Sequence, residues 1–107
     1  MITADLAKEV IARYERHGWT LKSALLSKET RRAIDDSVFA DVSVVDSDFD
    51  ALWFARTSHG QREAWELRSL SENPYALFEA FEADETEEDR AEARHEMENK
   101  MRSHMAK

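Results

Sequence analysis

Three aspartates, Asp46, Asp48 and Asp50, alternate in the segment DSDFD, as the first ligands of a calcium-binding loop do. Carboxylates at alternate positions can converge on one cation. The later positions do not fit such a loop: Ala51 stands where the sharp turn needs glycine, and Thr57 where a bidentate glutamate is needed. We therefore interpret this segment as an acidic turn between two strands.

A second possible metal site lies near the C-terminal end of the sequence. The run that begins at His95 starts like the zinc-binding helix of metalloproteases, but Asn99 stands where the second histidine belongs. His104 follows His95 by about 2.5 helical turns, which would place the two rings on opposite sides of a helix. We expect no metal site here and histidines that face solvent.

Nucleophilic chemistry has one candidate, the pair Ser58 and His59. Adjacent residues in a tight turn point in different directions, and no buried carboxylate is evident to orient the imidazole. We interpret His59-Gly60 as the two-residue loop of a hairpin, which requires positive φ. The chain has no cysteine, so thiol nucleophiles, thiolate metal sites and disulfides are excluded. Its two glycines, Gly18 and Gly60, are too few for a phosphate-binding loop, and we expect no cofactor.

The composition limits the class of protein. The 107 residues carry a formal net charge of -8, and 36% of them are charged. Nucleic-acid binding needs a cationic surface, so nucleic acid is not an expected partner. No apolar run approaches the ~20 residues that span a bilayer, and the first residues do not resemble a secretory signal. We expect a cytoplasmic protein that contacts no membrane.

Residues 51–68 carry the clearest structural information, because they specify their own folding partner. Pairing the two halves around His59-Gly60 places three complementary pairs on one face: Phe54 with Trp65, Leu52 with Leu67, and Arg56 with Glu63. Cross-strand pairs of these kinds stabilise a hairpin by about 0.2–1 kcal/mol each. The sequence therefore predicts a β-hairpin over 51–69 in this register.

The remaining segments are assigned from hydrophobic periodicity and capping residues. Residues 4–17 form an amphipathic stripe that begins after the potential N-cap Thr3 and ends before Gly18. Pro74 suits the first position of a helix in which Leu77, Phe78 and Phe81 would be buried. The full prediction is helices at 4–17, 28–36, 74–82 and 86–106, and strands at 19–26 and at 38–45, the latter starting near Asp41.

This order predicts an α+β fold. We expect an antiparallel sheet of about four strands with helices packed on one face, plus a charged C-terminal helix. Residues 1–82 would form the α+β domain, and residues 83–107 an acidic helical extension of the same domain. The tail has a thin apolar stripe, so it can add little to a core by itself.

The second face of the hairpin suggests a function, because it would expose Trp53 beside small side chains. Such a face is typical of a protein interface, although the chain's own C-terminal helix could cover it instead. The predicted partner-binding residues are Trp53, Ala55, Ala64, Glu66, Met97, Met101 and Met105. We expect a non-catalytic protein-interaction module, adaptor-like or chaperone-like, that forms a homodimer. The alternative is a small enzyme or ligand-binding domain, with Arg56 and Glu63 in a pocket between sheet and helices.

Overall fold

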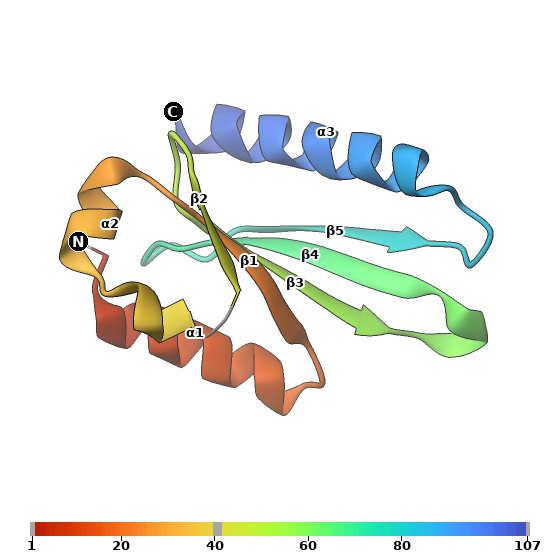
Figure 1. Cartoon of the computed structure of the whole chain (residues 1–107), viewed down its shortest axis with the longest axis horizontal. Coiled ribbons are helices and arrows are strands. Elements are labelled where there is room, and N and C mark those ends of the chain that lie inside the picture. The colour runs from red at the N-terminus through yellow and green to blue at the C-terminus, as the bar shows by residue number, and fades with distance from the viewer. Residues whose placement is uncertain (1, 40–41, 107) are drawn as a thin grey trace.

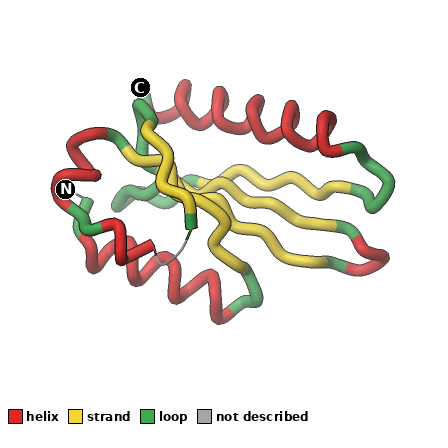
Figure 2. Tube along the Cα trace, viewed as in Figure 1, coloured by secondary structure: helices red, strands yellow, loops and turns green. Residues whose placement is uncertain are grey.

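The structure is a computed structural model that describes residues 2–39 and 42–106, and it is built in three layers. A five-stranded sheet forms the middle layer (Figures 1 and 2). In Figure 1, α1 (Ala4–Arg16) lies below the sheet, α3 (Glu87–Met105) lies above it, and the short α2 (Lys28–Ala33) lies to the left of the strands. The predicted α+β class is confirmed. The C-terminal helix α3, which the prediction set apart from the helices on one face, covers the face opposite α1.

The sheet has one more strand than predicted and is mixed. The strands, in chain order, are β1 (Thr20–Leu26), β2 (Ser43–Asp46), β3 (Ala51–Thr57), β4 (Glu63–Ser69) and β5 (Ala76–Phe81). Their order across the sheet is β2-β1-β3-β4-β5, and β1 pairs with β2 in parallel. The prediction of about four antiparallel strands is therefore wrong. A parallel neighbour needs a crossover, which α2 and the 3-10 turn Asp36–Phe39 supply. The predicted start of β2 near Asp41 lies outside the described residues.

Residues 76–81 form β5, and the predicted helix at 74–82 is wrong. The backbone N–H of Ser69 donates to the carbonyl of Tyr75 at 2.8 Å, which starts an antiparallel ladder directly after the turn at 71–74. The ladder continues from the pair Arg68–Ala76 to the pair Glu63–Phe81. A helix here would have left the outer edge of β4 unpaired, and pairing with β4 satisfies the backbone of both segments.

The predicted hairpin exists, but its register differs by one residue. Ala55, not Phe54, lies opposite Trp65, and Leu67 lies opposite Trp53. The loop is longer than the predicted two residues: Ser58 N–H donates to Arg62 O at 2.7 Å, with Gly60 at φ 68° between them. A one-residue slip moves every side chain of one strand to the other face relative to its partner strand. Trp53 and Trp65 therefore share a face.

Each face of the sheet has its own core. On the α1 face, Val10 of the helix packs over Leu52 and Phe54. On the α3 face, Met97 and Met101 pack over Trp53 and Leu67. All five residues from Ala51 to Ala55 are buried, so β3 is enclosed from both sides. None of the helices in the described ranges is long and apolar enough to span a membrane.

The boundaries of α1 follow from its capping residues, as predicted. The hydroxyl of Thr3 accepts a hydrogen bond from the N–H of Leu6 at 3.1 Å. Gly18 has φ 84°, a left-handed conformation that reverses the chain into β1. Tyr14, in the last turn of the helix, stacks on Phe54 at 4.1 Å between ring centroids. This contact sets the C-terminal half of α1 against the centre of the sheet.

Candidate interaction surface

Trp53 is covered by α3 of its own chain. The side chain is 3% exposed, its Nε1 donates to Oε2 of Glu98 at 3.0 Å, and its ring meets Trp65 edge to face at 5.9 Å. Met97 and Met101, 6% and 0% exposed, complete the contact. Trp53 lies on the predicted face, opposite α1, but the prediction that it is exposed is wrong, because α3 covers that face. A partner could reach Trp53 only after α3 had left the sheet.

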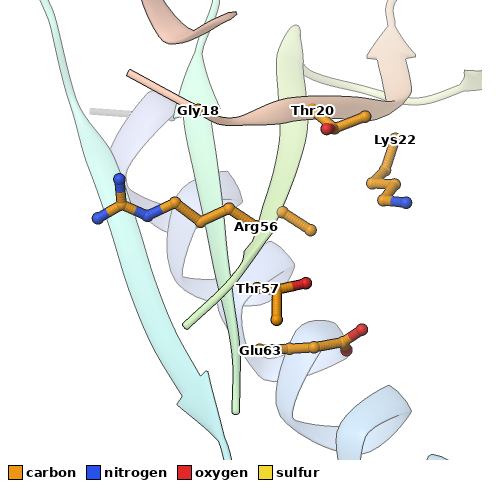
Figure 3. Close-up of a pocket in the computed structure, with 7 residues that line it drawn as sticks. Gly18, Thr20, Lys22, Arg56, Thr57 and Glu63 are labelled. Atoms are coloured by element: carbon orange, nitrogen blue, oxygen red, sulfur yellow. The ribbon is translucent and has the colours of Figure 1, made fainter. Parts of the chain in front are cut away.

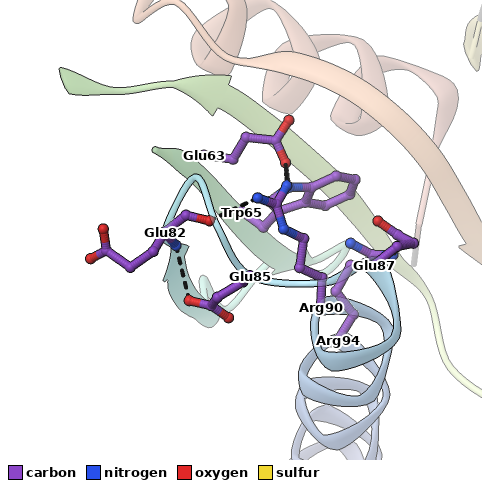
Figure 4. Close-up of polar contacts among 7 residues, drawn as sticks. All are labelled: Glu63, Trp65, Glu82, Glu85, Glu87, Arg90 and Arg94. Carbon is purple, nitrogen blue, oxygen red and sulfur yellow. Dashed lines mark hydrogen bonds and ion pairs between the residues drawn. The ribbon is translucent and has the colours of Figure 1, made fainter. Parts of the chain in front are cut away.

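Polar contacts attach α3 to the sheet at both of its ends. Near its start, Arg90 Nη1 donates to Glu63 at 2.9 Å and Nη2 to the carbonyl of Glu82 at 2.8 Å (Figure 4). The Arg94 guanidinium lies over the ring of Trp65, 4.6 Å from its centroid. Near its end, Arg102 pairs with Asp48 at 2.9 Å. Ion pairs therefore hold both ends of α3 on the sheet, and a narrow contact made by methionine side chains lies between the two ends.

The predicted partner-binding residues are divided between the two faces of the sheet. Trp53 and Ala55 belong to the α3 face, with Met97, Met101 and the partly buried Met105. Ala64 and Glu66 pair with Arg56 and Phe54, so they belong to the α1 face. The residues on the α3 face already pack against one another within the chain. The second lies next to β5, where Ala64 is opposite Ala80 and Glu66 is opposite Phe78.

Arg56 and Glu63, the predicted ligand-binding pair, are not paired with each other. Both line an open pocket of about 380 Å³, in which their side chains extend in opposite directions (Figure 3). Arg56 donates to the carbonyl of His17 at 3.0 Å and lies over the ring of Trp19, while Glu63 accepts from Arg90. Their placement does not supply the converging charges that a ligand-binding role requires.

The possible metal and nucleophile sites are also dispersed. Asp46 pairs with Arg31, Asp48 with Arg102, and Asp50 accepts from the backbone N–H of Ser27 at 2.8 Å. Within residues 2–39 and 42–106, no three histidine, aspartate or glutamate side chains lie close enough to hold a metal ion. Ser58, His59, His95 and His104 are exposed, and His104 stacks on Tyr75.

The outer part of the α1 face is open, because α1 lies over β1 and β3 and leaves β5 uncovered. The described part of the chain keeps two large apolar side chains exposed: Phe78 on β5, at 57%, and Val45 on β2, at 45%. Ala76 and Ala80 flank Phe78 on the same face and are also exposed. We call Ala76, Phe78 and Ala80 the β5 patch.

A row of aromatic rings connects this patch to the core. Tyr14 meets Trp19 edge to face at 6.1 Å, and Trp19 meets Phe78 in the same way at 6.4 Å. The hydroxyl of Tyr14 donates to the half-buried carboxylate of Glu66. Burial, followed by this hydrogen bond and the charge of Glu66, raises the pKa of Tyr14 above its ordinary value. The row ends at Phe78, whose ring is more than half in solvent.

The β5 patch is not among the predicted site residues, because the predicted helix at 74–82 includes Phe78. One signal could have shown the strand: Tyr75, Phe78 and Phe81 make this run rich in aromatic residues, which favour strands. The run is also short for a stable helix. A strand here exposes every second side chain on the uncovered face.

Fold and surface together define a small α+β domain whose sheet has an uncovered edge strand. Comparison with protein-family models, with curated proteins and with solved structures finds no significant match. Its function is therefore inferred from its own residues.

Proposed function

We propose that the protein is a non-catalytic protein-interaction module that self-associates through the β5 patch. The observation that carries the proposal is Phe78, a large apolar side chain 57% exposed on an edge strand. Isolated exposed apolar residues are common on protein surfaces and need no explanation. Phe78 differs because it extends a row of aromatic rings, lies between two exposed alanines, and belongs to a strand with an unpaired edge.

The exposed ring can contribute useful binding energy. Complete burial of a phenylalanine side chain stabilises an interface by about 1.5–3 kcal/mol, so covering the exposed part of Phe78 contributes roughly 1–1.5 kcal/mol. Aromatic side chains are enriched at interface centres, where small neighbours allow close approach. A contribution of this size, repeated on two copies, favours a reversible association rather than a permanent one.

The mass in solution tests this function. Sedimentation equilibrium or light scattering over a range of concentrations should show a mass that rises from monomer towards dimer. Phe78→Ser should keep the protein monomeric, whereas Val45→Ser, which changes the other exposed apolar side chain, should associate like the wild type. A wild-type protein that stays monomeric up to millimolar concentration contradicts the proposed function.

A further inference from the structure

The outer edge of β5 has unpaired backbone groups at known positions. Residues of an antiparallel strand direct their backbone groups alternately to one neighbour and to the other. Tyr75 directs its carbonyl to Ser69 of the preceding strand, so Leu77, Glu79 and Phe81 do the same along the ladder. The residues between them, Ala76, Phe78 and Ala80, therefore direct their N–H and C=O groups outwards.

This edge lacks the features that usually prevent strand addition. Edge strands are commonly protected by proline, lysine, a β-bulge or very short length. Residues 76–81 contain no proline and no lysine, and their pairing with β4 runs without a register shift. Their single charge is Glu79. The opposite edge of the sheet, β2, has four residues, whereas β5 has six.

We infer that the partner is a second copy of this chain, which adds its own β5 antiparallel to β5 so that the two Phe78 residues lie opposite each other. The inference rests on the proposed self-association and specifies its geometry. A two-fold axis makes the same strand contact itself, so residue i lies opposite j whenever j lies opposite i. Two five-stranded sheets would then become one continuous sheet.

The two-fold axis can pass through an outward-facing residue or through one of the residues between them, because both arrangements pair outward-facing backbone groups. An axis at Leu77 would place Ala80 opposite Pro74, and an axis at Glu79 would place the two Glu79 carboxylates directly opposite each other. An axis at Ala76 would place Phe78 opposite Pro74, which has no N–H to donate. An axis at Ala80 would place Phe78 opposite the carboxylate of Glu82. The axis at Phe78 places Ala76 opposite Ala80 twice, and it leaves space beside the two rings. This register is therefore the one that the edge favours.

The charges of β5 are compatible with this register, but they lower the stability of the dimer. Glu79 lies opposite Leu77 of the other copy, so no two like charges are directly opposed. The two Glu79 side chains are diagonal neighbours, about 7–8 Å apart, and repel each other. Each copy also carries a net charge of -8. Added salt should therefore strengthen the dimer, because it screens this repulsion.

Cysteine cross-linking tests the register directly, since the chain has no native cysteine. Ala76→Cys and Ala80→Cys replace exposed small side chains, so both variants should fold normally. The register places position 76 opposite position 80 of the other copy, about 5.5 Å apart between Cα atoms, whereas two copies of position 76 are about 14–15 Å apart. A mixture of the two variants should cross-link under mild oxidation, and neither variant should do so alone.

The outcomes separate this geometry from the proposed function. A dimeric mass together with no cross-link in the mixture would overturn the β5 register and leave self-association intact. Cross-links in each variant alone would likewise exclude the antiparallel pairing about Phe78. A monomeric mass at all concentrations would remove both the function and the geometry.

Glu79 provides an independent test. Glu79→Gln should lower the dimer dissociation constant by about two- to five-fold, because it removes the diagonal repulsion. Glu29→Gln makes the same change in net charge at an exposed position on α2, and it should leave the dissociation constant unchanged. Equal effects of the two variants would show a response to overall charge alone and contradict a role for the β5 edge.

Discussion

Met101 tests whether α3 is held on the sheet by its buried methionines. Met101 is 0% exposed and packs in the cluster that contains Leu25, Trp53 and Leu67. Met105 lies one turn later on the same helix and is only partly buried. Met101→Ala should therefore destabilise the protein substantially more than Met105→Ala. The two substitutions have the same intrinsic effect on helix formation, so their difference reports burial.

The expected magnitude follows from the exposure of each side chain. Truncating a fully buried methionine to alanine costs about 2–5 kcal/mol, and less where neighbours can move into the cavity. α3 packs from one side only and can shift towards the sheet, so we expect about 2–3 kcal/mol for Met101→Ala. Met105→Ala should cost about 1 kcal/mol or less, because part of its side chain already contacts water. The larger loss should lower Tm by roughly 10–20 °C.

Urea denaturation provides the assay. Unfolding should be followed both by circular dichroism and by tryptophan fluorescence, since Trp53 and Trp65 lie under α3. The free energy of unfolding in water comes from linear extrapolation of each curve. Equal losses of less than about 0.5 kcal/mol for both variants would contradict the packing of Met101 against the sheet, because a cavity under a packed helix lowers stability. Fluorescence that changes at lower urea than circular dichroism would indicate that α3 leaves the sheet first.

Two further predictions concern α1 and its contacts. Because the folded state raises the pKa of Tyr14, this side chain stabilises the protein below the unfolded pKa of about 10 and loses that contribution as pH rises above it. Urea titrations at several pH values should therefore show a steeper alkaline loss of stability for the wild type than for Tyr14→Phe; parallel curves would contradict the assignment. Gly18→Ala should cost about 1–2 kcal/mol, because φ is 84° and no neighbour lies within 4 Å of an added Cβ, so the loss is one of backbone strain. Gly18→Asn should cost less in thermal denaturation, since asparagine tolerates this conformation better, and equal losses would point to another cause.

The predicted surface and the observed one differ for a traceable reason. The prediction placed Trp53 on the same face as Ala64 and Glu66, and on the face opposite Trp65, because a two-residue loop at His59-Gly60 set the register. The loop runs instead from Ser58 to Arg62, and the additional residue moves Trp65 to the side of Trp53. Neither register conflicts with the apolar pattern of β3, because Ala51–Ala55 are buried on both faces. Alternation can define a register only where one face meets water.

At Phe78 the local sequence pattern is also insufficient, but here it predicts the wrong secondary-structure element and not the wrong strand register. Apolar residues at 77, 78 and 81 fit one side of a helix, and Pro74 suits a helix start, so the local pattern supports the wrong element. The strand forms because β4 offers an unpaired edge to the segment that follows it. That edge comes from the hairpin and is not visible in residues 74–82 themselves.

Elements whose signals are local can be predicted from the sequence alone. Thr3 and Gly18 set the limits of α1, Thr86 caps α3 through the N–H of Asp89, and the two halves of 51–69 pair as a hairpin. The face that Trp65 joins, the packing of α3, and the extension of the sheet by residues 76–81 depend on tertiary contacts. Capping depends on atoms a few residues apart, whereas strand pairing and face assignment depend on which distant backbone and side-chain groups still need a partner.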